Sequence, residues 1–284
     1  MFRLCCLCLI SIVIFWCIKE RYTNSFYITS RLSTQTLQKR HIIPRNNLLL
    51  SFNIQRMPYH MKPLWKLQRL VRRHSIVLLQ ECYSNVMYDE IQYTFPDYYI
   101  AKGVMVNYKL ANSGLIILSR YPIRSTTFVP FDDQDYMTAD ILTEKGFLMV
   151  ELNFHNQAIS IINTHLQSSC YINGNDTTHK QINQLLSHVK KIEHPFIIGG
   201  DFNVHYQKFP STTLTLYRTS RPTIYIHYDK DGKELATSPI SKPYYKGYMF
   251  DYFITSRILL SSVHIYPSMY SDHVPICATI SHVL

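Results

Sequence analysis

Short apolar runs that end in polar side chains are the sequence feature that most constrains the fold of this chain. In the clearest case, residues 194–198 form the pattern of a short buried strand, and Gly199 and Gly200 follow where a side chain would crowd a neighbouring strand or ligand. Asp201 and Asn203 come next. In a continuing strand, residues two apart point to the same side of the sheet, so both side chains would lie at its carboxyl edge. Gly, Asp and Asn are also ordinary turn residues, and this stretch alone fits a β-turn equally well.

The same arrangement recurs along the chain, which weakens the turn interpretation. The other polar residues at or near the ends of apolar runs are Asn53, Glu81, His165, Asp251, and Asp272 with His273. Singly, each has an ordinary explanation as a turn residue, a helix N-terminal acid, a core histidine or a surface residue near a bend. All of those explanations would have to hold at once for the chain to lack a site, because strand ends converge in layered α/β folds.

The apolar runs alternate with segments of helical periodicity. Apolar side chains recur at helical spacing over about 61–73 and over 178–191, so we expect helices there. Strands are expected at 48–54, 75–81, 98–100, 113–123, 147–154, 158–163, 248–255 and near the C-terminus. Residues 205–247 are expected to form a long irregular loop or hairpin region. The full chain of 284 residues is 46% hydrophobic and 17% charged, so it can bury a sizeable core, and we expect one α/β domain over residues 48–284.

Positive charge is concentrated at the N-terminal end of the chain. A formal net charge of +10 would usually suggest an anionic partner. Residues 1–47, however, hold seven basic residues and one acidic residue, Glu20, so they carry +6 and leave +4 for residues 48–284. The expected domain is therefore only mildly basic, which weakens a nucleic-acid argument from charge.

Residues 1–21 are expected to be a signal peptide or a signal-anchor. The stretch 4–18 is apolar without interruption and flanked by basic residues, and its length suits a signal-peptide core better than a full membrane span. No small-residue cleavage site follows, so an anchor remains open, and a buried helix is the third alternative. Residues 22–47 have the composition of a basic polar linker. We therefore expect a protein that is secreted or anchored to a membrane through residues 4–18, and a glycosylation sequon at Asn175 fits that route.

Cysteine usage does not settle the redox compartment. Four of the seven cysteines lie in the N-terminal apolar stretch, and three remain in the expected domain: Cys82, Cys170 and Cys277. No CxxC or Cys/His zinc spacing occurs. The three remaining cysteines allow one disulfide with one thiol left over, or none.

The residues at the strand ends share a chemistry of carboxylates, carboxamides and two imidazoles, without a nucleophilic Ser or Cys motif. Glu81 and Asn53 offer the hard oxygen donors that Mg²⁺ binds together with water and phosphate oxygens. A His–Asp pair suits the activation of water. Together these groups suit hydrolysis of a phosphodiester by in-line attack of water with a divalent metal.

The ordered set of motifs resembles the endonuclease/exonuclease/phosphatase superfamily. The matching segments, in family order, are 51–54, 80–81, 113–115, 163–167, 200–203, 251–253 and 271–273. The resemblance covers residues 48–284 and implies a deoxyribonuclease-like four-layer α/β sandwich, in which two packed β-sheets are flanked by helices. Within the superfamily, four segments are most similar to the neutral Mg²⁺-dependent sphingomyelinases: Ala139-Asp140, Lys145-Gly146-Phe147, 164–167 and the helix that opens with Gln181.

The resemblance implies a metal site and a base. Glu81, assisted by Asn53, would hold Mg²⁺, for which Mn²⁺ or Co²⁺ could substitute. His273 would be the general base on the attacking water, oriented by Asp251. Asp272 would support that base or bind a second metal ion.

The resemblance also implies residues that act on the substrate. His165 would stabilise the phosphoryl charge or protonate the leaving oxygen, and Asp201 with Asn203 would position water and phosphate. Lys145 would contact the phosphate or the lipid headgroup, with a structural role as the equal alternative.

These implications favour a sphingomyelinase-like phospholipid phosphodiesterase. A deoxyribonuclease-like endonuclease is the alternative, and a catalytically inactive binding protein that keeps the fold is the third hypothesis. The expected substrate is a phospholipid or nucleic-acid phosphodiester. We expect contact with a membrane and infer no obligate protein partner.

Overall fold

The computed structural model of the protein describes residues 46–56, 62–104, 109–135, 138–168, 174–205, 223–225, 249–266, 268 and 270–284. The predictions for the N-terminal apolar stretch, the linker, Cys170 and most of 205–247 lie outside the described residues. Within the described ranges, no helix is both long and apolar enough to cross a bilayer.

One six-stranded sheet has the strand order β11-β12-β1-β2-β4-β3. Its strands are β1 (Leu48–Arg56), β2 (Ile76–Cys82), β3 (Tyr99–Lys102), β4 (Ile116–Ser119), β11 (Ile258–Ile265) and β12 (Ile276–Val283). The strands β1 and β2 run parallel, and the other pairs are antiparallel. The carboxyl ends of β1 and β2 therefore lie side by side.

The second six-stranded sheet has the order β5-β6-β7-β8-β10-β9. Its strands are β5 (Ile123–Pro130), β6 (Gly146–Phe154), β7 (Gln157–His165), β8 (Phe196–Asp201), β9 (Thr223–Tyr225) and β10 (Asp251–Ser256). The strands β7 and β8 run parallel, whereas β10 is antiparallel to β8. The start of β10 therefore meets the ends of β7 and β8.

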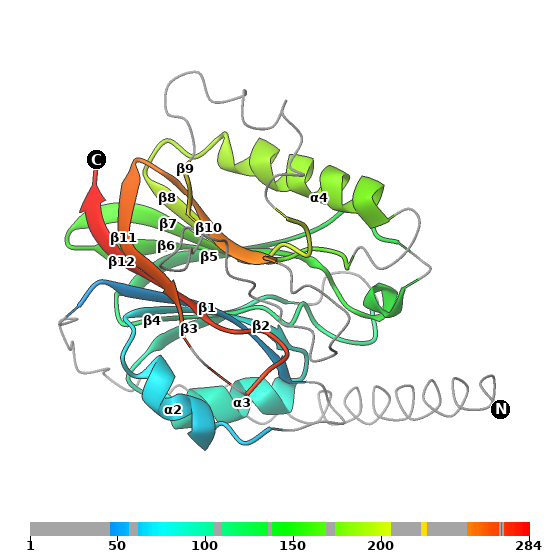
Figure 1. The fold of residues 1–284 in the computed structure, drawn as a ribbon, viewed down its shortest axis with the longest axis horizontal. Coiled ribbons are helices and arrows are strands. Elements are labelled where there is room, and N and C mark those ends of the chain that lie inside the picture. Colours follow the sequence, from blue (N-terminus) through cyan, green and yellow to red (C-terminus); the bar gives the residue numbers. More distant parts are fainter. Residues whose placement is uncertain are drawn as a thin grey trace, which may run out of the picture.

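The helices cover the outer faces of the two sheets. Helices α2 (Trp65–Val71) and α3 (Asn85–Thr94) lie against the first sheet, and α4 (Gly174–Val189) lies against the second, as Figure 1 shows. A short 3₁₀ helix, η1 (Ala139–Leu142), precedes β6. The four layers are thus helix, sheet, sheet and helix, which confirms the expected four-layer α/β sandwich.

Three apolar clusters hold these layers together. The central cluster lies between the sheets and includes Leu78, Ile117, Val150, Ile161 and Ile197. The other two clusters lie between each sheet and its helices. Burying one such side chain contributes roughly 1.5–3 kcal/mol relative to exposure. Because the central strands are buried on both faces, their sequences are nearly continuous apolar runs rather than alternating patterns.

A polar contact joins the two sheets inside this apolar core. The side chain of Asn163 in β7 donates hydrogen bonds to the carbonyls of Leu79 at 2.8 Å and Ile116 at 3.0 Å. Its oxygen accepts a hydrogen bond from Gln80 Nε2 at 2.7 Å. Buried polar groups are costly unless they are paired, so these bonds fix the position of one sheet on the other.

Most expected elements are present, with differences that have a physical cause. The predicted helices are confirmed at Trp65–Val71 and Gly174–Val189. The sequence did not predict α3, which buries only Met87 and Ile91 and begins at a Ser84 cap that accepts a hydrogen bond from the Met87 amide. Nor did it predict most of β5, which is largely polar and exposed, or β11, whose apolar residues are only partly buried at the sheet edge.

Candidate active site

The polar strand ends of the second sheet meet at the carboxylate of Asp201. Asp201 ends β8, and its partners in register are His165 at the end of β7 and Asp251 at the start of β10. Residues paired in register point to the same side of a sheet, so the three side chains face one space. All three are buried. The second sheet therefore brings two carboxylates and one imidazole together.

The two glycines before Asp201 make this close approach possible. Gly200 has a φ of +146°, and a Cβ there would lie 2.0 Å from the carbonyl oxygen of Thr164 in β7. A Cβ on Gly199 would lie 2.7 Å from Leu78 of the opposite sheet. Larger residues would push away either the neighbouring strand or the other sheet. The prediction that a side chain would crowd a neighbouring strand here is confirmed.

The first sheet contributes Asn53 from β1 and Glu81 from β2. The Asn53 amide nitrogen donates to Glu81 Oε1 at 3.0 Å and to Asp201 Oδ2 at 3.0 Å, so one amide joins carboxylates from both sheets. The Asn53 oxygen accepts a hydrogen bond from the Gln55 amide at 3.0 Å. Glu81 has a φ of +60°, a conformation that is unfavourable for most residues and that turns the chain at the site.

His273 lies in the segment that leads into β12 and faces two carboxylates. Its Nδ1 donates to Asp251 Oδ2 at 2.7 Å, and its Nε2 lies 3.5 Å from Asp201 Oδ2. Burial lowers the pKa of His273, but the charges of Asp251 and Asp201 outweigh burial and raise this pKa to about 10. This is the geometry of an imidazole that a carboxylate orients through Nδ1, leaving Nε2 to exchange a proton.

His165 lies near the same Asp201 carboxylate as His273, but the charge beside its ring is the positive charge of Lys145. Its Nε2 lies 3.5 Å from Asp201 Oδ2 and 3.0 Å from the amine of Lys145. Burial and the positive charge of Lys145 lower the pKa of His165 to about 3. At neutral pH His165 is therefore neutral, whereas His273 in the metal-free chain is protonated. Two groups whose pKa values are driven apart are suited to different proton-transfer roles.

Lys145 lies behind His165 and is only 1% exposed. Its amine forms an ion pair with Asp140 Oδ1 at 3.3 Å, and Asp140 Oδ2 accepts hydrogen bonds from the Ser168 amide at 2.9 Å and from Gln167 Nε2 at 3.1 Å. The structure thus places the Lys145 amine against His165 and Asp140. This arrangement fits the structural role expected as the alternative for Lys145 better than direct contact with a headgroup.

Asn203 lies at the site, and Asp272 lies at its margin. The Asn203 amide donates to Asp201 Oδ1 at 2.9 Å, and its side chain donates to the carbonyl of Leu166 at 2.9 Å. Asp272 is exposed and accepts a hydrogen bond from Ser271 Oγ at 3.1 Å. Asn53 donates to Asp201 and Glu81, and the expectation that Asp272 supports His273 or binds a second metal ion stays a prediction.

Two sets of side chains at the site could hold a divalent cation. In the first, Glu81 and Asp201 converge on Asn53. Burial raises the pKa of Glu81 and Asp201 adds to the rise, whereas the Asn53 hydrogen bond opposes it. In the second, ligand atoms of Asp201, Asp251 and His273 all lie within 4.8 Å of one another, but His273 already donates to Asp251. The oxygen donors of the first set fit a hard cation such as Mg²⁺.

The fold and the site together define a deoxyribonuclease-like α/β sandwich with histidines and carboxylates at the ends of its central strands. Residues 50–273 match the Endonuclease/Exonuclease/phosphatase family, and the chain belongs to that family.

Among curated proteins, a similar one is Sphingomyelinase C 2 from Leptospira interrogans serogroup Icterohaemorrhagiae serovar Lai (strain 56601). It is 24% identical over 156 residues, which cover 47% of this chain and 25% of the Leptospira protein. The match thus spans a quarter of the length of that relative.

Several solved structures share the fold. The crystal structure of SmcL has a TM-score of 0.64 at 19% identity and covers 84% of this chain and 100% of that chain. A beta toxin variant from Staphylococcus aureus with bound magnesium ions has a TM-score of 0.64 at 18% identity, covering 83% and 100%. D. rerio TDP2 complexed with a single-strand DNA product has a TM-score of 0.62 at 15% identity, covering 84% and 100%. At these identities the likeness shows the fold alone.

Proposed function

We propose that this chain is a Mg²⁺-dependent phosphodiesterase that hydrolyses a phospholipid. The observation that carries the proposal is the convergence on Asp201 of Asn53 at 3.0 Å and of two histidines, each at 3.5 Å. Within the described residues this cluster contains no serine or cysteine nucleophile, and its groups suit a reaction in which water is the nucleophile. Membership of the family and the similarity to a sphingomyelinase support the same reaction class.

In the proposed reaction, water attacks the phosphorus in line with the leaving oxygen. His273 takes the proton of the water through Nε2, while Asp251 holds the ring through Nδ1 at 2.7 Å. Mg²⁺ held by Glu81 and Asp201 would stabilise negative charge on the phosphate oxygens. Its charge would also offset that of Asp201, which otherwise favours the protonated form of His273.

The other side of the site stabilises the transition state electrostatically. His165 and the Lys145 amine behind it, 3.0 Å apart, supply donors and positive charge close to Asp201. Fixed dipoles and charges in a buried site act more strongly than they would in water, and they need no rearrangement during the reaction. Asn203 would act by fixing Asp201, to which its backbone amide donates at 2.9 Å.

A phospholipid substrate is supported by the similarity to Sphingomyelinase C 2 and by the modest charge of residues 48–284. The competing substrate is a nucleic acid, since D. rerio TDP2 with its single-strand DNA product has a similar fold. Contact with a membrane, and secretion or anchoring through residues 4–18, belong to the same proposal.

The decisive experiment compares two substrates with one enzyme preparation. The full chain with Mg²⁺ is assayed for phosphocholine release from sphingomyelin liposomes and for nicking of supercoiled plasmid. His273→Ala tests the site, and His282→Ala, an exposed histidine in β12, is the matched control. Lipid hydrolysis that only His273→Ala abolishes would support the proposal. Plasmid nicking alone would assign the protein to the nucleases. Activity on neither substrate with an intact fold would exclude sphingomyelin and DNA, and would refute the phospholipid proposal if vesicles of an anionic phospholipid are not hydrolysed either.

A further inference from the structure

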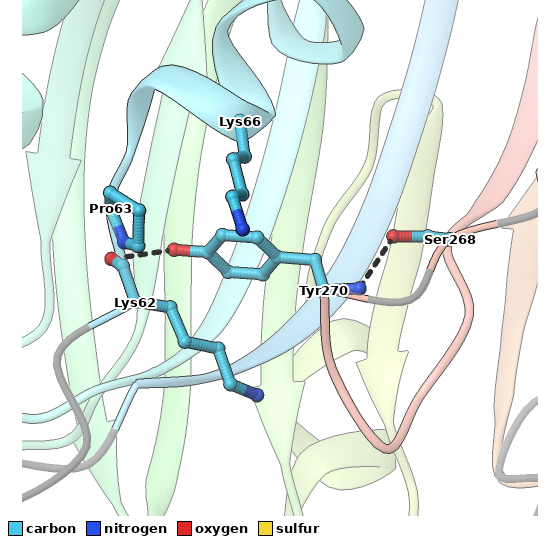
Figure 2. Close-up of a pocket in the computed structure, with 5 residues that line it drawn as sticks. All are labelled: Lys62, Pro63, Lys66, Ser268 and Tyr270. Carbon is cyan, nitrogen blue, oxygen red and sulfur yellow. Dashed lines mark hydrogen bonds between the residues drawn. The ribbon is translucent and has the colours of Figure 1, made fainter.

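A cavity of about 410 Å³ lies beside the candidate active site and is lined by two lysines. Its lining residues are Lys62, Pro63, Lys66, Ser268 and Tyr270, as Figure 2 shows. A cavity of this volume is at the small end of the range for ligand sites and can hold a substituent of a lipid headgroup. The reactions proposed above for the Asp201 site do not use any of these residues.

Tyr270 is fixed in the middle of this lysine cavity. Its hydroxyl donates to the carbonyl of Lys62 at 2.9 Å, and its backbone amide donates to Ser268 Oγ at 3.2 Å. In Figure 2 the ring lies between the two lysine side chains, and the Lys62 amine lies 5.7 Å from the ring centroid. Since the Tyr270 hydroxyl is already used, the two ammonium groups are the strongest polar groups that the cavity offers.

Within the described part of the chain, the two lysines of the cavity form no direct ion pair. Among the residues that the structure describes, neither lysine amine has a carboxylate oxygen within 4.0 Å. The Lys66 amine instead lies 5.6 Å from the ring centroid of Trp65. Two ammonium groups around one cavity attract an anion and repel a cation.

The lysine cavity is connected to the candidate active site through Lys62. The Lys62 amine donates to Gln55 Oε1 at 3.0 Å, and the Gln55 amide donates to Asn53 Oδ1 at 3.0 Å. Burial lowers the pKa of Lys62, and the negative charges of Asp272 and Glu81 oppose that shift. Lys62 thus lies one side chain, Gln55, away from Asn53 of the candidate active site.

We infer that the lysine cavity binds a second anionic group on the headgroup of the phospholipid substrate, an inference that rests on the proposed function. The quaternary amine of a choline headgroup would be repelled by Lys62 and Lys66, whereas a phosphate monoester would be attracted by both. Trp65, which is 69% exposed and lies on the same helix as Lys66, favours a lipid surface over a nucleic acid, because tryptophan is enriched where proteins meet the bilayer interface. The preferred substrate is thus a phospholipid with an anionic headgroup.

The activity test uses the full chain and phosphatidylcholine vesicles that contain an equal mole fraction of either sphingomyelin or phosphatidylinositol 4-phosphate. We expect faster hydrolysis of phosphatidylinositol 4-phosphate. In Lys66→Glu the ratio of the two rates should fall at least about tenfold, because a repulsive charge replaces an attractive one. Lys190→Glu, at an exposed lysine just after α4, is the matched control and should retain the ratio. Preference for sphingomyelin, or an unchanged ratio in Lys66→Glu, would overturn the inference.

A binding test separates failure of the lysine cavity from failure of the proposed function. The dissociation constant of inositol 1,4-bisphosphate is measured by calorimetry on the His273→Ala chain, with and without Lys66→Glu. Weakening by about tenfold or more supports the lysine cavity even if no lipid is hydrolysed, and unchanged binding overturns it. If Lys66→Glu slows cleavage only of a single-stranded oligonucleotide, the lysine cavity holds a nucleotide phosphate and the lipid assignment is wrong. Circular dichroism confirms that each variant is folded.

Discussion

Two histidines face the carboxylate of Asp201, and their surroundings drive their pKa values in opposite directions. His273 is surrounded by the carboxylates of Asp251 and Asp201, and its pKa is raised to about 10. His165 is buried beside the ammonium of Lys145, and its pKa is lowered to about 3. Burial and the Lys145 charge on one side, and the two carboxylates on the other, therefore give two chemically identical residues different protonation behaviour.

These pKa values predict how stability depends on pH in the metal-free chain. The pKa of His273 is raised on folding, so its stabilising effect is complete below pH 6.5 and is lost as the pH rises through about 10. The pKa of His165 is lowered on folding, so stability is lost as the pH falls from 6.5 through about 3. The free energy of unfolding, measured by urea denaturation in EDTA, should therefore decline by a few kcal/mol on either side of a maximum near pH 6.5.

Single substitutions identify which histidine causes each decline in the free energy of unfolding. His273→Ala should flatten the alkaline side of the profile, and His165→Asn should flatten the acid side relative to the parent chain. A profile that keeps both slopes in both variants would show that other groups control the pH dependence.

Substitution of Lys145 should destabilise the chain and remove an activating charge. Lys145→Met leaves Asp140 without its cation, and breaking a buried ion pair costs about 3 kcal/mol. Removing this charge should also raise the pKa of His165. Urea denaturation of the double variant Asp140→Asn/Lys145→Met is the control, because removing both charges should restore part of the lost stability. A double variant as unstable as the sum of both singles would contradict this pairing.

The sequence predicted which residues lie at the site better than it predicted which of their side chains contact one another. Asn53, Glu81, His165, Asp201, Asp251 and His273 were all expected near strand ends, and the structure brings them together. The contact that brings Asp201 within reach of Asn53 and Glu81 could not be predicted, because it depends on how two separate sheets pack. Lys145 was expected to have either a substrate contact or a structural role, and its ion pair with Asp140 could not be predicted from a local pattern.

At the level of elements, the parallel pair β7 and β8 sets the geometry of the site. His165 and Asp201 are in register at the ends of these strands, and Gly200 allows the backbone of Thr164 to approach. The site therefore depends on a backbone contact as much as on its own side chains.

Gly200→Ala should distort this strand pair. The added Cβ would lie 2.0 Å from the Thr164 oxygen, at a φ of +146° that alanine rarely adopts. We expect a loss of about 2 kcal/mol or more in the free energy of unfolding and a fall in activity of at least a hundredfold, since small displacements of reacting groups are costly. Chemical denaturation and initial rates measure both effects. Ile198→Val in the same strand is the control and should cost about 0.5–1.5 kcal/mol with activity retained.

Strands that the sequence predicted are more deeply buried than β11, which it missed. The strands β1, β2 and β8 are buried along nearly all their length, so their apolar runs stand out in the sequence. In β11 buried and exposed residues alternate only partly, and the pairing with β12 shifts register twice. Its position at the sheet edge follows from pairing with a distant segment, which a local pattern does not specify.

At the scale of the whole molecule, a bound cation should link the two sheets. Glu81 belongs to the first sheet and Asp201 to the second, and Asn53 already bridges them at 3.0 Å. Mg²⁺ at a hundredfold excess over its dissociation constant should raise the free energy of unfolding by about 2.7 kcal/mol. Thermal denaturation with and without EDTA measures the effect.

Glu81→Gln should abolish most of this response to Mg²⁺. Glu193→Gln, at an exposed position before β8, is the matched control and should respond like the parent chain. An equal response in Glu81→Gln would place the stabilising cation elsewhere.

The bridge of Asn163 and Gln80 across the core has a consequence for how the molecule matures. Each sheet holds only part of the site: the first supplies Asn53 and Glu81, and the second supplies His165, Asp201 and Asp251. A folding intermediate with both sheets formed but not yet joined would show the circular dichroism of the native strands. Its candidate active site would not yet be assembled. The onset of catalysis would then report the last step of assembly. A treatment that weakens the contact between the two sheets would abolish activity before the protein unfolds.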